Sequence, residues 1–91
     1  MTSDDTRRRR ALYRAQHRGT KEMDFLLGRY AEARLPAMTA DDITTFEELL
    51  ALPDPELQGW LMHGKSFDGS SLTGLLRDIQ AFHGIGETRQ S

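Results

Sequence analysis

The amino-acid sequence predicts an all-α protein, folded as a small compact five-helix bundle. The 91 residues contain no valine and only three isoleucines, and no stretch of four or more residues alternates apolar and polar side chains as a strand does. Apolar residues instead recur three and four positions apart between capping residues, glycines and prolines, which indicates helices. A chain of this length supports one modest core. We therefore expect residues 1–91 to form a single domain, with flexible tails at 1–6 and 85–91.

The first two helices are expected over residues 5–17 and 20–34, joined by a sharp corner. Thr20 is the expected N-cap of the second helix, and Pro36 ends it because the residue before a proline avoids the helical conformation. Gly19 is expected to end the first helix in the left-handed conformation. The candidate N-caps of the first helix are Asp4, Asp5 and Thr6. The second helix carries the clearest core-facing stripe, consisting of Met23, Leu26, Leu27, Tyr30 and Ala31.

The third helix is expected to be acidic on its outer face. It begins at a capping Thr39 or Asp41, ends near Leu52, and turns Glu47 and Glu48 toward water. Its inward face holds Ile43, Phe46, Leu49 and Leu50.

The fourth and fifth helices are expected to be short. The sequence Asp-Pro-Glu predicts a helix over 54–63, with Asp54 as N-cap and the proline in the first turn. A serine at 70 or 71 caps the fifth helix, and Gly84 ends it. Their expected core residues are Leu57, Trp60 and Leu61 in the fourth, and Leu72, Leu75, Leu76, Ile79 and either Phe82 or His83 in the fifth.

Composition and motifs exclude several kinds of site. The chain has no cysteine, which excludes disulfides, iron–sulfur ligation, thiolate zinc sites and cysteine nucleophiles. His17, His63 and His83 fall on different elements without a partner at ligand spacing, so we predict no metal site. Neither a G-x-S-x-G turn nor a glycine-rich loop between a strand and a helix is present. The sequence therefore predicts no catalytic residues, no stably bound cofactor and no enzyme activity.

The sequence also indicates where the protein works. The N-terminal stretch lacks the apolar region of a secretory signal, and no apolar run reaches the roughly 18 residues of a membrane helix. We therefore expect a cytoplasmic protein that does not insert into a membrane.

Charge is distributed unevenly along the chain. Residues 1–34 hold nine Lys and Arg against five Asp and Glu, residues 35–91 hold three against nine, and the formal net charge is −2. The basic run Arg7–Arg10 leaves two interpretations open: a solvated helix end, or the arm of a small helical regulator that binds nucleic acid or another protein. The acidic remainder of the chain favours the first, so we expect no nucleic-acid partner.

The hexapeptide HRGTKE, residues 17–22, is the most informative stretch. A glycine lets two helices turn sharply with their backbones close together. It leaves Arg18 at the end of one helix and Glu22 in the first turn of the next, where the helix dipoles favour each charge. This R-G-x-x-E is either a well-capped corner or a small patch that presents Arg18, Gly19 and Glu22 to a partner. In the second case, Arg18→Ala and Glu22→Ala are expected to leave the fold nearly unchanged.

The longer segment HRGTKEMDFLLGRYA, residues 17–31, resembles the signature of the succinate dehydrogenase assembly factor family, also called FAD assembly or flavinylation factors. The likeness continues in order and spacing through FEELLALPDPELQGWLM at 46–62 and the H-G-K turn after it, and covers roughly residues 8–83. R-G-x-x-E alone is a weak motif, whereas its combination with L-x-x-P-D-P-x-L-x-x-W-L-M is specific.

This resemblance implies a small five-helix bundle that has no catalytic machinery of its own. It implies a chaperone that binds the flavoprotein subunit of succinate dehydrogenase, or in some members of fumarate reductase, and promotes covalent attachment of FAD to a histidine of that subunit. Arg18, Gly19 and Glu22 match the family motif and are the partner-binding residues that the resemblance implies. Attachment takes place on the flavoprotein, so we expect this chain to act by holding a conformation of its partner, without binding FAD stably itself.

Overall fold

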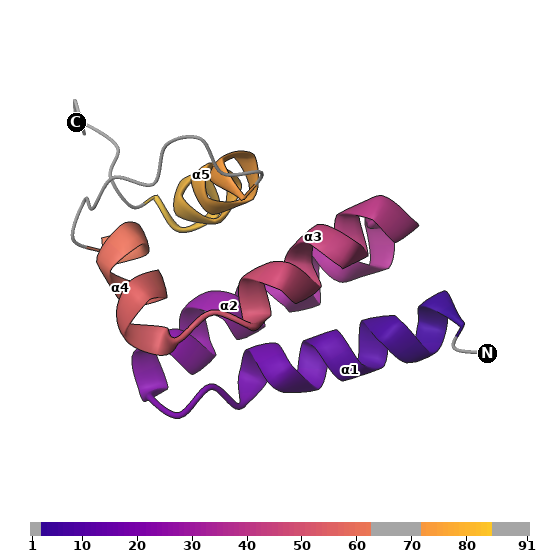
Figure 1. Ribbon diagram of the computed structural model, residues 1–91, viewed down its shortest axis with the longest axis horizontal. Coiled ribbons are helices and arrows are strands. Elements are labelled where there is room, and N and C mark those ends of the chain that lie inside the picture. Colours follow the sequence, from indigo (N-terminus) through magenta and orange to yellow (C-terminus); the bar gives the residue numbers. More distant parts are fainter. Residues whose placement is uncertain (1–2, 63–71, 85–91) are drawn as a thin grey trace.

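The computed structural model describes residues 3–62 and 72–84 of the chain (Figure 1). No strand occurs among these residues, so the all-α prediction is confirmed. They form five α-helices and one short 3₁₀ helix: α1 (Asp4–Gln16), α2 (Lys21–Arg34), η1 (Leu35–Ala37), α3 (Ala40–Leu50), α4 (Asp54–Met62) and α5 (Thr73–His83).

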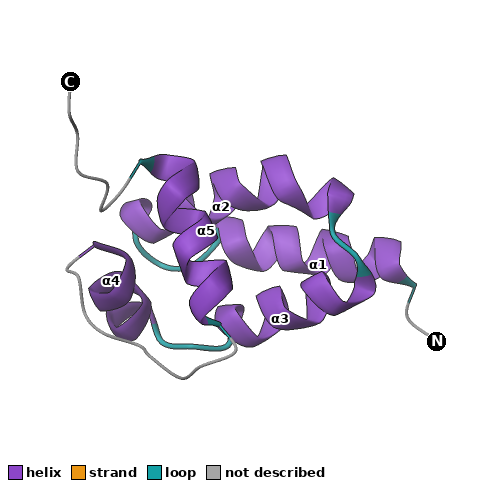
Figure 2. Ribbon diagram, turned by 90° about the horizontal axis from the view of Figure 1, so that it is seen from above, coloured by secondary structure: helices purple, strands orange, loops and turns teal. Residues whose placement is uncertain are grey.

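Three of the helices lie side by side and another crosses them. Figure 2 shows α1, α2 and α3 running alongside one another, with α5 across one face of this layer. Helix α1 contacts both α2 and α3, and α5 contacts α2 and α4. Helix α4 lies at the end of this layer at which α1 ends and α2 begins (Figure 1). The corner between α1 and α2 is therefore close to the start of α4.

The apolar faces of the five helices meet in one core. Leu27, Phe46 and Leu76, which come from three different helices, are completely buried. The predicted stripe of α2 and the predicted inward face of α3 are buried along their whole length, which confirms both periodicities. Trp60 and Leu75 pack against this core from positions that are only partly covered. Burial of these side chains is the main favourable term in folding a chain of this size.

The fully buried side chains of α1 are small, while Leu12 packs against the core from a partly covered position. Ala11 and Ala15 are buried against α2, and an added Cβ at Gly28 of α2 would lie only 3.1 Å from Cγ of Gln16. Small residues at this contact leave room for the neighbouring backbone, so the two helices approach closely.

Two of the predicted helix caps are confirmed. The Thr20 hydroxyl accepts a hydrogen bond from the N–H of Met23 at the start of α2. Thr39 caps α3 in a reciprocal capping box with Asp42, in which each side chain accepts from the other's backbone N–H at 3.1 Å. Helix α3 ends at Leu50, two residues earlier than expected.

The predicted cap of α1 is wrong. Ser3, which precedes all three candidates, is the N-cap, and its hydroxyl accepts from the N–H of Thr6. The helix begins at Asp4, so Asp4 and Asp5 both lie in its first turn, where the dipole favours their negative charge.

Helix α5 ends as predicted at Gly84, which has a left-handed φ of 72°. Of the two candidates near this end, His83 is the more deeply placed, with Nε2 lying 2.7 Å from the carbonyl oxygen of Leu26, while Phe82 is 36% exposed. The N-cap of α5 is Leu72, with no side-chain hydrogen bond, so the predicted serine cap is wrong. His63, Ser70 and Ser71 themselves lie outside the described part of the chain.

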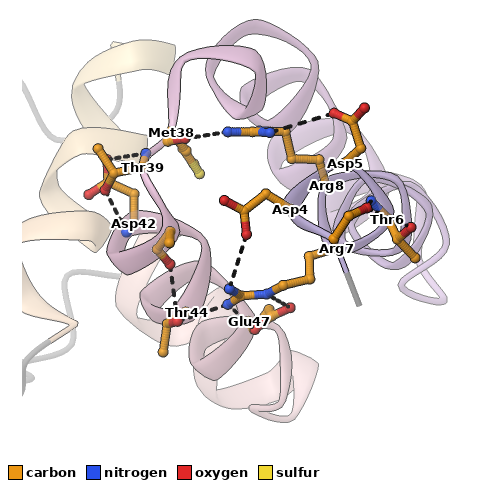
Figure 3. A network of polar contacts seen from close by, with 12 residues as sticks. Asp4, Asp5, Thr6, Arg7, Arg8, Met38, Thr39, Asp42, Thr44 and Glu47 are labelled. Carbon is orange, nitrogen blue, oxygen red and sulfur yellow. Dashed lines mark hydrogen bonds and ion pairs between the residues drawn. The ribbon is translucent and has the colours of Figure 1, made fainter. Parts of the chain in front are cut away.

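The start of α1 is tied to α3 by Arg7 (Figure 3). Its Nη2 donates to Oγ1 of Thr44 at 2.8 Å and to Oε1 of Glu47 at 2.9 Å. The prediction that Glu47 faces water is therefore wrong, because α1 packs on this side of α3 and brings a guanidinium to it. Glu48, one position further round the helix, is exposed as expected.

Arg8 ties α1 to the end of α2 in a similar way (Figure 3). Its Nε donates to the carbonyl of Leu35 at 3.1 Å and its Nη2 to the carbonyl of Met38 at 2.8 Å. The carbonyl of Leu35 also accepts from the N–H of Met38, so Arg8 gives Leu35 a second donor and gives the carbonyl of Met38, just after η1, a donor from α1. Two of the four arginines in the basic run are thus engaged within the fold.

Candidate functional site

The corner between α1 and α2 is a tight turn made by Gly19. Helix α1 ends at Gln16 and α2 begins at Lys21. Gly19 has a φ of +128°, a conformation that other residues rarely adopt. The predicted role of Gly19 is therefore wrong in one respect: His17, with a φ of −130°, is the C-cap of α1, and Gly19 makes the turn into α2 two residues later.

The side chain of Arg18 points from this corner to the junction between α3 and α4, where it is only 10% exposed. Its Nε and Nη2 both lie 2.8 Å from Oδ1 of Asp54. Its Nη1 donates to the carbonyl of Leu50 at 2.5 Å, and Nη2 donates to the carbonyl of Leu52 at 2.6 Å. One guanidinium therefore contacts the end of α3, the linker after it and the first turn of α4.

In this position the guanidinium gives hydrogen-bond partners to carbonyls at and after the end of α3 and to the carboxylate at the start of α4. The last carbonyls of a helix lack partners and carry partial negative charge, and α3 has no basic residue in its own last turn. The planar guanidinium of Arg18 offers five N–H donors in a fixed geometry, which lets it serve carbonyls and a carboxylate together. Arg18 was expected to stabilise the end of α1, but it stabilises the end of α3 instead.

Asp54 differs from its prediction as well. It is the first residue of α4 rather than the residue before it, and the carbonyl of Pro53 accepts the hydrogen bond from the N–H of Leu57. The carboxylate of Asp54 turns to Arg18, and its other oxygen would lie 3.7 Å from a Cβ added at Gly19. The start of α4 is thus held against the corner itself.

Asp24 holds the backbone of the same corner. Its Oδ1 accepts hydrogen bonds from the N–H of Arg18 at 2.5 Å and from the N–H of Gly19 at 3.3 Å. Sequence reasoning missed Asp24 and Asp54 as parts of this site. For Asp24 a usable signal existed, because a carboxylate in the first turn of a helix can fold back onto N–H groups ahead of that helix.

Glu22 lies on the outer side of the corner. It is exposed, and its Oε1 accepts a hydrogen bond from Nε2 of Gln58 in α4 at 2.8 Å. The structure therefore corrects the expectation that Arg18 and Glu22 share one surface patch: Arg18 turns inward, whereas Gly19 and Glu22 remain on the surface. Because Arg18 bonds the α3–α4 junction, we now expect Arg18→Ala to destabilise the fold.

A shallow, largely apolar hollow of about 490 Å³ begins beside Glu22. Phe25 and Met62, which line it, are 54% and 37% exposed. The sequence placed Phe25 off the core stripe, as observed, but gave it no role; a large aromatic residue at an exposed helical position is the signal that was available. The hollow is lined by Lys21, Glu22, Phe25, Leu26, Met62 and His83.

The corner places a carboxylate, an exposed glycine and an apolar hollow side by side, and is the candidate site of this chain. Within residues 3–62 and 72–84, no three His, Asp or Glu side chains gather in a group that could hold a metal ion. In the same part of the chain, no helix is long and apolar enough to cross a membrane.

Known proteins resemble most of this chain. Residues 9–83 match the model of a family described as flavinator of succinate dehydrogenase. The FAD assembly factor SdhE of Acetobacter pasteurianus is 45% identical over 71 residues, which are 78% of this chain and 65% of that protein. The protein of the same name in Coxiella burnetii is 35% identical over 63 residues, covering 69% of this chain and 77% of that one.

A longer relative is the mitochondrial succinate dehydrogenase assembly factor 2 of Komagataella phaffii. It is 36% identical over 58 residues, which are 64% of this chain and 30% of that protein. The chain thus spans just under two thirds of the Acetobacter protein and less than one third of the Komagataella protein.

Proposed function

The chain belongs to the family of flavinators of succinate dehydrogenase, which it matches over residues 9–83, and on this premise we propose that it is an assembly chaperone. It binds the flavoprotein subunit of succinate dehydrogenase and promotes the covalent attachment of FAD to that subunit. One observation carries the proposal. The family match includes the whole corner from Arg18 to Glu22, and it also includes the α4 segment that Arg18 contacts.

The corner suits a binding role because its parts are held before a partner arrives. Arg18 fixes the junction of α3 and α4, and Asp24 fixes the backbone at Gly19. A surface that is already ordered loses less conformational entropy when it binds. Glu22 and the hollow beside it are then presented in one arrangement, with Gln58 holding the carboxylate of Glu22.

Each of the three residues in the motif has its own task. Glu22 contacts the flavoprotein directly, its carboxylate accepting hydrogen bonds from cationic or N–H groups of the partner. Gly19 keeps the surface free of a side chain, so that the partner approaches the backbone closely. Arg18 is a positioning residue that acts through the α3–α4 junction.

The chaperone acts on the conformation of its partner. A factor promotes attachment only if it binds the attachment-competent conformer of the flavoprotein more tightly than the other conformers. FAD is the cofactor of the flavoprotein, and this chain has no site of its own that binds FAD stably. It supplies no nucleophile or proton and is not an enzyme.

The flavoprotein of fumarate reductase is a second partner under this proposal, because the same surface would recognise a flavoprotein of the same kind. The protein works in the cytoplasm without membrane insertion. Binding to nucleic acid is not part of its function, and the engagement of Arg7 and Arg8 within the fold supports this, since fewer arginines of the basic run are left for phosphates.

Covalent flavin on the purified flavoprotein subunit, read as in-gel fluorescence after denaturation, tests the proposal. With the chaperone at a limiting concentration, the wild-type chain is expected to raise the yield clearly above that without it. Glu22→Ala is expected to weaken binding by about 2–5 kcal/mol, because it leaves a group of the partner without its charge partner.

Glu48→Ala is the matched control, since it removes another exposed carboxylate from a helix remote in sequence from the corner. It is expected to keep the wild-type flavin yield, and both variants are expected to keep the wild-type melting temperature. A flavin yield that does not respond to the wild-type chain would overturn the proposed function. Equal yields with Glu22→Ala and the wild-type chain would remove Glu22 from the binding surface.

A further inference from the structure

Two exposed arginines on α1, Arg10 and Arg14, are unlike the arginines that brace the fold. Arg7, Arg8 and Arg18 are bound to carboxylates and carbonyls. In contrast, Arg10 and Arg14 are exposed and form no ion pair or hydrogen bond with another side chain in the described ranges 3–62 and 72–84. The basic run of the sequence is thus divided by the fold into an inner part and an outer part.

Arg10 and Arg14 share the outer face of α1 with two rings. Tyr13 is 63% exposed, more than any other large apolar residue in the described part of the chain. Its ring stacks on His17 with the centroids 3.9 Å apart. Nδ1 of His17 lies 2.7 Å from the carbonyl oxygen of Tyr13, and because a carbonyl only accepts, Nδ1 carries the proton of this hydrogen bond. The two rings therefore have a fixed orientation on the helix surface.

The four side chains form one continuous stripe. Their positions, 10, 13, 14 and 17, follow the i, i+3, i+4, i+7 spacing that places residues on a single helix face. The stripe, which we name the α1 outer face, ends at His17 and so adjoins the corner at Arg18 and Gly19. Cationic and aromatic side chains that remain exposed together are typical of a binding surface, since aromatic residues and arginine dominate the energetics of interfaces.

We propose that the α1 outer face is a second docking surface, which binds an acidic segment on the surface of the flavoprotein partner. The argument for this occupant is charge complementarity: Arg10 and Arg14 present two guanidinium groups without a carboxylate, and carboxylates bind guanidinium groups in a bidentate geometry. This inference rests on the proposed function for the identity of the partner, and it extends the contact area beyond the motif around Glu22.

The dimensions of the stripe favour a polypeptide over a nucleic acid. Seven residues of helix span about 10 Å, which is enough for a short acidic segment. A tight nucleic-acid complex neutralises about six to ten phosphates, which two arginines do not supply. The formal net charge of −2 also opposes the approach of a polyanion, while it leaves a local contact with an acidic segment possible.

Charge reversal at Arg10 tests this surface, with reversal at Arg77 as the matched control. Both residues are exposed arginines inside helices, and both variants change the net charge equally. The dissociation constant of each full-length variant for the purified flavoprotein subunit of succinate dehydrogenase is measured by calorimetry. Arg10→Glu is expected to weaken binding by about tenfold or more, and Arg77→Glu by less than about twofold.

Three further measurements strengthen the test. Arg10→Gln is expected to fall between the wild-type chain and Arg10→Glu, because it removes the attraction without adding repulsion. The wild-type affinity is expected to fall as NaCl rises from about 50 to 300 mM, and the fall is expected to be shallower in Arg10→Gln. Melting temperatures of all variants are expected to match that of the wild-type chain, since Arg10 supports no contact of the fold.

Two results would overturn the inference while leaving the proposed function intact: unchanged affinity in Arg10→Glu while the wild-type chain still raises the flavin yield, or equal losses in Arg10→Glu and Arg77→Glu. A labelled duplex DNA that binds more tightly than the flavoprotein and is released by Arg10→Glu would replace the acidic polypeptide with nucleic acid. A wild-type chain that neither binds the flavoprotein nor raises the flavin yield would overturn both proposals.

Discussion

Arg18 and Asp54 are 36 residues apart in the sequence, yet two nitrogens of the arginine lie 2.8 Å from one oxygen of the aspartate. The pair joins the loop between α1 and α2 to the first turn of α4. The same guanidinium also satisfies the carbonyls of Leu50 and Leu52. Arg18 of the R-G-x-x-E motif, which looks like an exposed charge in the sequence, is thus part of the framework that holds the corner against α3 and α4.

Arg18→Ala is expected to lower the free energy of unfolding by about 3–5 kcal/mol, because it leaves a largely buried carboxylate and two carbonyls without their partner. Urea denaturation measures this loss. A double-mutant cycle with Asp54→Ala is expected to be strongly non-additive, since either change alone breaks the same pair. A loss below about 1 kcal/mol in Arg18→Ala would mean that the pair behaves as an ordinary surface ion pair.

Gly19→Ala and Gly19→Arg are expected to separate strain from steric blocking. A Cβ at this position would have ordinary contacts, the nearest at 3.7 Å, so the cost comes from the φ of +128° and amounts to about 1–3 kcal/mol for either residue. Thermal melting is expected to give equal losses for the two variants. If the partner approaches Gly19 closely, only Gly19→Arg abolishes flavoprotein binding at a temperature where both variants are folded; similar affinities for both would speak against a close approach.

The stability of the fold at alkaline pH is expected to depend on Tyr30. Burial, and then the hydrogen bond that its hydroxyl donates to Asp78, raise the pKa of Tyr30 well above its ordinary value of 10.0. In the unfolded chain the tyrosine loses its proton near pH 10, so above that pH the folded state holds a proton that the unfolded state has lost. The contribution of Tyr30 is therefore complete below about pH 10 and decreases as the pH rises further.

Tyr30→Phe removes this titration. Urea denaturation at a series of pH values from about 8 to 11 is expected to show a shallower decline for Tyr30→Phe than for the wild-type chain. At the lower end of the series the variant is expected to be less stable by about 1 kcal/mol, from the lost hydrogen bond. Parallel declines in the two proteins would show that Tyr30 titrates alike in the folded and unfolded states.

Leu76→Ala is expected to lower the free energy of unfolding by about 2–5 kcal/mol, since Leu76 is completely buried and its removal leaves a cavity. Leu27→Ala, in α2, is expected to cost a similar amount. The neighbouring Leu75 is only partly covered and is the matched control, with a smaller expected loss for Leu75→Ala. Chemical denaturation of the three variants checks this order, and an equal loss at Leu75 and Leu76 would contradict the position of the core on α5.

The predictions that the structure confirms depend on interactions between near neighbours in the chain. Thr20 caps α2 through a hydroxyl that reaches only three residues ahead, and the stripe through Leu27 depends on the 3.6-residue repeat of a single helix. Gly84 ends α5 because its own backbone adopts the left-handed conformation, which glycine does without strain. Each of these features can be judged from a window of a few residues.

Two of the wrong predictions, unlike the locally decided N-cap of α1, concern residues whose partners come from another helix. Glu47 was expected to face water because its own helix turns it outward, but α1 brings Arg7 to it across 40 residues of sequence. Asp54 was expected to cap α4, but a guanidinium from the α1–α2 corner offers its carboxylate a stronger, charge-assisted partner. A local rule cannot anticipate a competing partner that arrives from a distant segment.

The sequence by itself determined the class of fold, the positions of the helices to within about two residues, the core-facing stripes and the location of the corner around Gly19. Only the tertiary structure decided which way the polar side chains of that corner point: Arg18 inward to the α3–α4 junction, and Glu22 outward beside an apolar hollow. The physical reason is the separation along the chain over which each interaction acts. Helix periodicity and capping act over three or four residues, whereas unsatisfied carbonyls and carboxylates accept whichever donor the packing of the helices brings within hydrogen-bonding distance.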